Sequence, residues 1–222
     1  MKTINLLTTN AQLAITTSTL TPSKILCIGR NYVEHIKELN NDVPDEMVVF
    51  FKPNSAISSV LNAHHLMEPL HYEAELCFLY QQGKFSAVAL GLDLTKRTLQ
   101  SALKAKGLPW ERAKAFDGSA VFSDFVAIES HHIDHLSLSL TINNTLTQQG
   151  SVELMMYKPV EILAELLQFV SLEDGDIVMT GTPKGVGVIQ SGDSFSGSVS
   201  INSSAANVTE AEVLINQQWF AQ

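Results

Sequence analysis

Residues 72–80 constrain the fold of this chain more than any other stretch, because they are largely apolar on both sides and yet carry two acids. Side chains of a β-strand alternate between its two faces, so Glu73 and Glu75 lie on the same face. An unpaired carboxylate in an apolar setting costs several kcal/mol, and two of one sign also repel each other. The sequence therefore predicts a positive group between the two glutamates. The alternative is an edge strand that exposes both to water.

A third acid follows in a similar setting. Residues 81–84 (Gln-Gln-Gly-Lys) have the composition of a hairpin turn, and the next apolar run, 88–94, contains a single charge, Asp93. Three carboxylates on paired strands would offer only oxygen ligands, which suits a hard divalent cation such as Mg²⁺. Neither Cys27 nor Cys77 suits that ion, so magnesium fits this pattern better than zinc.

Length and composition favour one domain with a real core, because the chain has 222 residues and 45% hydrophobic residues. We expect residues 1–22 to form an extension packed on or near a main domain of residues 23–222. No apolar run is long enough to span a bilayer, and the N-terminus has no extended apolar segment of the signal-peptide type. Two distant cysteines fit a reducing compartment, so we expect a cytoplasmic protein.

The charge balance limits the kind of partner. The formal net charge is −9 with only 14 lysines and arginines, which disfavours nucleic acids and anionic membranes. We therefore expect a small-molecule partner. The strands outnumber the helices in the sequence pattern, which predicts an α+β, mainly β domain with a mixed sheet.

A histidine and a glutamate form a candidate general base. Residues 33–39 have a helical pattern, which places His35 and Glu38 three apart on one helical face. The acid would fix the histidine tautomer and stabilise the imidazolium that forms when water is deprotonated. The alternative is a solvated surface pair. The histidine-rich residues 131–135 lie in a polar connection, and we interpret them as a solvated loop, not a metal site.

Further polar side chains lie downstream of Asp93. A predicted helix over residues 96–106 carries Arg97 and Gln100 in its first turn, where both could face an anion near the cation. Lys114 has apolar neighbours, and a partly buried lysine needs an anion or loses its proton. Residues 181–187 (Gly-Thr-Pro-Lys-Gly-Val-Gly) could cradle a carboxylate through backbone N–H groups, although they lack the ending of a phosphate-binding loop.

In order and spacing, these motifs resemble the fumarylacetoacetate hydrolase (FAH) family from about residue 24 to residue 193. The resemblance rests on Gly29-Arg30-Asn31-Tyr32 with His35 and Glu38, Glu73-Ala74-Glu75-Leu76, Asp93-Leu94-Thr95-Lys96-Arg97 with Gln100, Lys114-Ala115-Phe116-Asp117, and Thr180-Gly181-Thr182-Pro183-Lys184-Gly185-Val186-Gly187. It implies the mixed β-sandwich roll of that family, a homodimer, and bound Mg²⁺ or Mn²⁺. The length is similar to that of the short acylpyruvate-hydrolase-like branch.

The resemblance also implies a role for each matched position. These are metal ligands at Glu73, Glu75 and Asp93, a water-activating pair at His35 and Glu38, contacts to the reacting oxygen at Gln100 and Lys114, and contacts near the substrate carboxylate at Arg97 and Thr182.

The activity implied first is a metal-dependent hydrolase that cleaves the C–C bond of acylpyruvates (2,4-diketo acids) to pyruvate and a carboxylic acid. We prefer hydrolysis at this stage because the water-activating pair is present. The alternative is an oxaloacetate decarboxylase or a keto–enol tautomerase (isomerase) that uses the same site without water. A different class of function is a sensor that binds a keto acid without converting it.

Overall fold

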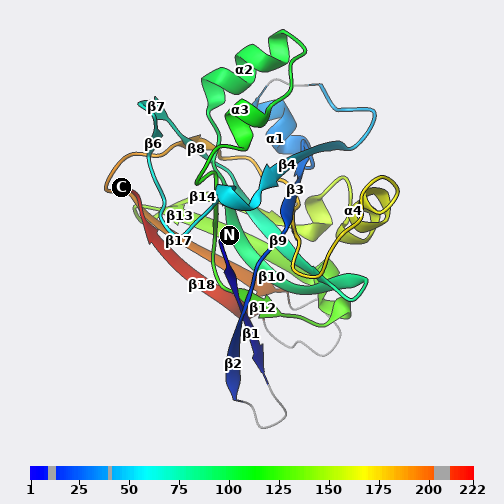
Figure 1. Cartoon of the computed structure of the whole chain (residues 1–222). Helices are drawn as coiled ribbons and strands as arrows, with labels where there is room; N and C mark the ends of the chain where they lie inside the picture. Colours follow the sequence, from blue (N-terminus) through cyan, green and yellow to red (C-terminus); the bar gives the residue numbers. More distant parts are fainter. Residues whose placement is uncertain (10–13, 40–41, 203–210) are drawn as a thin grey trace.

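The computed structural model describes residues 1–9, 14–39, 42–202 and 211–222 (Figure 1). Strands dominate these residues, which confirms the α+β, mainly β prediction. The α-helices are α1 (Val33–Glu38), α2 (Arg97–Ala105), α3 (Glu111–Lys114) and α4 (Pro159–Leu166), and short 3-10 helices span Asn54–Ala56, Ser130–His135 and Val152–Leu154.

The larger sheet is mixed, with parallel pairs such as β3–β15 among antiparallel ones. Its central path runs in the order β2 (Ile15–Leu20), β1 (Ile4–Thr9), β12 (Phe125–Ala127), β10 (Lys84–Asp93), β9 (Ala74–Gln81), β15 (Ile177–Met179), β3 (Lys24–Gly29) and β4 (Val48–Pro53), while β11 (Ala120–Phe122) pairs with β10 and with β5 (Ile57–Ser58). Residues 74–80 of the predicted run therefore lie in the middle of the sheet, whereas Glu73 precedes β9 and Tyr72 belongs to another, two-stranded sheet.

A second, antiparallel sheet packs against one face of the first. It has the order β14 (Thr145–Ser151), β13 (Leu136–Ile142), β17 (Ser194–Ile201) and β18 (Glu212–Phe220), and two small ribbons pair β16 (Gly187–Val188) with β8 (His71–Tyr72) and β6 (His64–His65) with β7 (Glu68–Pro69). The two sheets approach closely at Gly197, where an added Cβ would lie 2.2 Å from Leu90 Cδ2. Phe78 and Leu140 belong to the core between the sheets.

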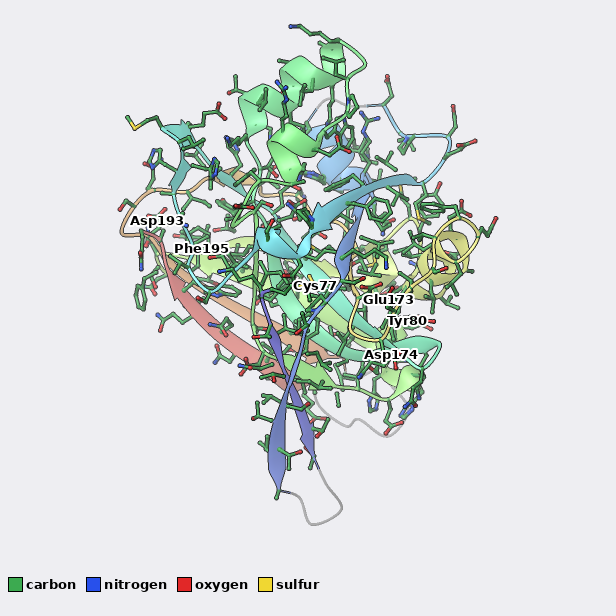
Figure 2. All side chains as sticks on the ribbon, viewed as in Figure 1. Cys77, Tyr80, Glu173, Asp174, Asp193 and Phe195 are labelled. Carbon is green, nitrogen blue, oxygen red and sulfur yellow. The ribbon has the colours of Figure 1, made fainter. Side chains whose placement is uncertain are left out.

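A separate core lies on the other face of β9. Its members include Ile25, Cys77 and Phe125, and the buried side chains of this cluster come from strands of the larger sheet alone. The sheet therefore curls around its own apolar face, which together with the second sheet makes the expected β-sandwich roll. Burial on both faces of β9 confirms the reading of the sequence run. Figure 2 shows Cys77 near the middle of the molecule and Tyr80 at the end of the strand.

Helices α1, α2 and α3 gather at one end of the molecule, beside the start of β9 and the end of β10 (Figure 1). The N-terminal hairpin β1–β2 projects at the opposite end. Strand β1 pairs in parallel with β12, so these residues belong to the larger sheet, and the division into an extension and a main domain stays a prediction. In the described part of the chain, no helix is long and apolar enough to cross a membrane.

Candidate active site

Three buried acids meet where β9 and β10 pair. The backbone N–H of Asp93 donates to the carbonyl of Glu73 at 2.8 Å, and Glu75 lies opposite Gly91. The residues Glu73, Glu75 and Asp93 are 6%, 2% and 1% exposed, and each side chain offers an oxygen within 4.8 Å of the others. The solvent-exposed edge strand considered as the alternative is therefore wrong. No comparable group of metal-binding side chains is found elsewhere in the described residues, which include the histidine-rich segment 131–135.

The positive group that the strand pattern predicted between Glu73 and Glu75 lies instead between Glu73 and Asp93, and among the described residues no cation forms an ion pair with Glu75. Lys114 Nζ is 2.9 Å from Glu73 Oε2 and 2.7 Å from Asp93 Oδ2, and it also donates to Thr95 Oγ1 at 2.7 Å. Lys52 is fully buried, with its Nζ 2.8 Å from Asp93 Oδ1, and it donates to the carbonyl of Lys114. Arg97 forms an ion pair with Glu73.

The acids differ in their electrostatic surroundings. Burial opposes ionisation of Glu73, but Lys114 and Arg97 outweigh that effect and hold its pKa below the usual range. Burial and the nearby charges of Asp93 and Glu73 raise the pKa of Glu75 well above its usual value. Burial alone would lower the pKa of Lys114, but Asp93 and Glu73 reverse the direction and raise it. Lys114 is therefore held as an ammonium group.

Glu75 receives its one recorded hydrogen bond from a backbone turn. The N–H of Gly181 donates to Glu75 Oε2 at 2.7 Å. Gly181 has a φ of +95°, and an added Cβ would lie 2.9 Å from Asn31 Cβ and 3.0 Å from the Ile28 carbonyl. Only glycine fits this position, because any side chain would clash with the neighbouring backbone and force an unfavourable φ.

The predicted histidine–glutamate pair is formed, and its histidine lines one pocket together with the three acids. His35 Nδ1 lies 3.1 Å from Glu38 Oε2, and the Gly185 N–H donates to Glu38 Oε1 at 2.9 Å. His35 is 6% exposed, so the alternative of a solvated surface pair does not hold for the histidine. Because an ionised carboxylate can only accept, Nδ1 is the donor of this hydrogen bond, which directs the other ring nitrogen, Nε2, away from Glu38.

The other predicted positions also reach the pocket. Arg97 Nη1 donates to Gln100 Oε1 at 2.9 Å, and α2 presents both side chains to it. The Thr182 hydroxyl donates to the Ala74 carbonyl and accepts from Gln148 Nε2, each at 2.8 Å, so its contact with substrate stays a prediction. Of the nine predicted residues, all but Glu38 line the pocket: His35, Glu73, Glu75, Asp93, Arg97, Gln100, Lys114 and Thr182.

Sequence reasoning missed four charged or aromatic residues at this site. Lys52 ends an apolar run, and a lone lysine after the five apolar residues 47–51 was the available signal for a buried cation. The other three, Arg30, Lys104 and Trp110, line the pocket itself. Lys104 follows Gln100 by one helical turn, so it shares a face with Arg97 and Gln100, and that spacing could have revealed it.

The rolled β-sandwich holds a buried acidic site beside a histidine–glutamate pair, a combination that suits metal-assisted or acid–base catalysis. The model of the fumarylacetoacetate (FAA) hydrolase C-terminal family matches residues 24–212. The chain belongs to this family.

Within this family, the chain is similar to proteins of named activity and to solved structures. The oxaloacetate tautomerase YcgM of Escherichia coli is 38% identical over 193 residues, which cover 77% of this chain and 85% of that protein. The mitochondrial oxaloacetate tautomerase FAHD1 of Homo sapiens is 36% identical over 184 residues, covering 76% and 83%. The crystal structure of fumarylpyruvate hydrolase from Pseudomonas aeruginosa with Mn²⁺ and pyruvate has a TM-score of 0.79 at 26% identity, covering 98% of this chain and 95% of that one.

Proposed function

We propose that this protein is a metal-assisted keto–enol tautomerase of oxaloacetate. The observation that carries the proposal is that one buried pocket holds both a base, His35, and a fixed ammonium group, Lys114, which tautomerisation needs on either side of a carbonyl. The names of the relatives that are 36–38% identical support the same activity. Hydrolysis, which we preferred from the sequence, becomes the second candidate.

The three carboxylates fit a divalent cation. They supply only oxygen atoms, and Glu75 accepts a single recorded hydrogen bond, so its remaining acceptor capacity suits a cation. We propose that Glu73, Glu75 and Asp93 hold Mg²⁺ or Mn²⁺, the second being the ion in the Pseudomonas aeruginosa structure. A bound cation would act as a Lewis acid toward the carbonyl oxygen of a 2-keto acid.

The protein's own groups account for the proton transfer at carbon, and water supplies the proton on oxygen. His35 Nε2 takes a proton from C3 of the keto form, and the electron pair of that C–H bond forms the C2–C3 double bond. The C2 oxygen gains the carbonyl π pair, accepts hydrogen bonds from Lys114 and Gln100, and takes a proton from water. Glu38 stabilises the imidazolium, which then returns its proton to solvent. No bond between carbon atoms breaks.

Acylpyruvate hydrolysis remains a candidate because of one feature, the buried His35–Glu38 pair. The same Nε2 could take a proton from water, whose oxygen would then attack the distal carbonyl of a 2,4-diketo acid. The similarity to fumarylpyruvate hydrolase supports this reading. Decarboxylation of oxaloacetate, by contrast, needs no base, since the C3–C4 bond breaks and leaves its electron pair on C3.

One set of assays separates the three reactions. Protein with Mg²⁺ is mixed with enol oxaloacetate, and the enol absorbance and pyruvate are followed together; acetylpyruvate is offered separately. A tautomerase removes the absorbance faster than Mg²⁺ alone and forms no pyruvate. Pyruvate from oxaloacetate would instead show decarboxylation, and pyruvate with acetate from acetylpyruvate would show hydrolysis. No acceleration of the enol–keto conversion would refute the proposal.

The role of His35 has its own test. We expect His35→Asn to slow tautomerisation by about 10²- to 10⁴-fold, the usual contribution of a general base. The matched control is His64→Asn, because His64 is exposed and lies outside the pocket. Equal rates in the two variants would remove His35 from the mechanism.

We also propose that the protein works as a cytoplasmic homodimer. The homodimer follows from the family resemblance, and the compartment from the two free, buried cysteines, which fit reducing surroundings. Exposed apolar side chains at Leu66 and Met67 offer surface for association. Light scattering during gel filtration would measure the dimer directly, and a monomer at micromolar concentration would contradict it.

A further inference from the structure

Two cations at the pocket take no part in holding the three acids. Arg30 follows β3, and Lys104 lies in the last turn of α2, yet both line the same pocket together with Trp110. We propose that Arg30 and Lys104 form a subsite for the outer carboxylate of a dicarboxylic 2-keto acid. This inference rests on the proposed function, since oxaloacetate is a substrate of that kind, and it assigns recognition of the second carboxylate to residues outside the predicted set.

The side chain of Arg30 has unused hydrogen-bonding capacity. Its Nε is buried and has no hydrogen-bond partner among the described residues, while Nη1 donates to the Asp42 carbonyl at 3.3 Å. Its backbone is left-handed, with a φ of 57°, a conformation that costs free energy for any residue but glycine. A guanidinium group with free donors, held by an unfavourable backbone, is ready to bind a planar carboxylate.

Lys104 is held in place by an aromatic ring and not by an acid. Its Nζ lies 4.9 Å from the centre of the Trp110 ring, and the structure records no ion pair for it among the described residues. Burial, followed by repulsion from Arg30 and Arg97, lowers the pKa of Lys104 to about 8. An anion bound beside these cations would remove that repulsion.

The charge balance of the pocket also favours an anion beside Arg30 and Lys104. With a divalent cation bound, Glu73, Glu75 and Asp93 would all be ionised and carry three negative charges, which the three positive charges of Lys52, Arg97 and Lys114 balance. Glu38 is occupied by His35 and the Gly185 N–H. Arg30 and Lys104 are therefore surplus positive charges. A divalent cation would add two more, so the loaded pocket favours a dianion over a monoanion.

The subsite is tested by removing its charge and not its shape. Lys104→Met keeps the aliphatic stem against Trp110, and Lys106→Met is the matched control, because Lys106 is exposed and lies outside the pocket. Two substrates are compared with Mg²⁺ present: oxaloacetate and its 4-methyl ester, in which the outer carboxylate is uncharged. We expect Lys104→Met to lower kcat/KM for oxaloacetate by about 10- to 100-fold, the contribution of a charged hydrogen bond, and to change the ester less than about threefold.

A binding experiment separates this inference from the proposed activity. Malate, which does not react by tautomerisation, and 2-hydroxybutanoate, which has a methyl group in place of the outer carboxylate, are titrated into the same proteins by calorimetry. If the wild type binds malate more tightly and Lys104→Met abolishes the difference, the subsite stands even when oxaloacetate is not turned over. Arg30→Gln should weaken the binding of malate in the same way.

Two results would overturn the subsite. One is equal behaviour of Lys104→Met and Lys106→Met toward oxaloacetate and malate. The other is a wild type that does not distinguish malate from 2-hydroxybutanoate, including one that binds neither. If Lys104→Met does not fold, which circular dichroism would show, Arg30→Gln decides between the same outcomes.

Discussion

Asp176 and Glu75 are both buried acids, but they differ in the number of hydrogen-bond donors that surround their carboxylates. Asp176 accepts hydrogen bonds from the N–H and Oγ of Ser23 at 3.2 and 2.7 Å, from the N–H of Lys24 at 3.1 Å, and from the N–H of Glu173 at 2.9 Å. Lys24 Nζ adds an ion pair at 2.5 Å. Glu75 has one recorded donor, the Gly181 N–H.

Because the two carboxylates have different numbers of hydrogen-bond donors, their pKa values shift in opposite directions. Burial would raise the pKa of Asp176, but the Glu173 N–H and the side chains of Lys24 and Ser23 outweigh it and lower the pKa. Burial and two like charges raise the pKa of Glu75. An acid that serves the fold is saturated by donors from its own chain, whereas an acid with spare acceptor capacity in a pocket is a candidate ligand-binding group.

The largest expected effect comes from Glu75→Gln. The change keeps the shape and removes one oxygen ligand, so we expect metal-dependent turnover to fall by more than about 100-fold, since even the groups that only orient metal ligands lose 10- to 100-fold. Stability without metal should not fall, because burial already disfavours the charged form of Glu75 and the amide oxygen of glutamine can still accept from the Gly181 N–H. Initial rates and thermal unfolding measure the two effects.

Added Mg²⁺ supplies the second readout for Glu75. At 100 times its dissociation constant, the ion should stabilise the wild type by about 2.7 kcal/mol and raise its Tm, whereas Glu75→Gln should lose most of this gain. Glu129→Gln, at an exposed position, should keep it. If neither Mg²⁺ nor Mn²⁺ changed the Tm of the wild type, Glu75 would bind no cation. The distinction between Glu75 as a ligand-binding acid and Asp176 as a structural acid would then fail.

The second largest expected effect is a loss of folding stability in Asp176→Asn. Asp176→Asn should lower the free energy of unfolding by about 2–3 kcal/mol, because it weakens a buried network and leaves Lys24 without its carboxylate. Urea unfolding measures the loss, with the exposed Asp45→Asn as control. The turnover of each folded molecule should stay unchanged, and reduced turnover at full occupancy of the native state would show that Asp176 also serves the site.

The smallest effect is the pH dependence of that loss. The folded pKa of Asp176 is lowered, so its stabilisation is present above the ordinary aspartate pKa of about 3.9 and disappears as the pH falls through the folded value. The difference in unfolding free energy between wild type and Asp176→Asn should therefore be largest near pH 6 and shrink below about pH 4. A difference that stays constant down to pH 3 would mean that the carboxylate charge does not stabilise the fold.

Local pattern was sufficient for much of the fold and for most of the candidate site. Alternation along residues 72–80 predicted a strand buried on both faces, and helical spacing predicted that His35 and Glu38 would meet. These features depend on neighbours two to four residues apart, which a sequence displays directly. Strand β2 was missed because its residues are polar or exposed on both faces, so alternation gives no signal, and its pairing with β1 defines it.

By itself, the sequence determined that an acidic site had to be buried and that cations had to meet it. Only the tertiary structure decided which cations do so, because Lys52 and Lys114 reach Asp93 from segments 41 and 21 residues away. It also decided that the Asp176 carboxylate accepts hydrogen bonds from the distant Ser23 and Lys24. Arg30 and Lys104, by contrast, line the pocket without a carboxylate partner among the described residues. Packing of remote segments sets the partners of a buried charge, and no local pattern records those partners.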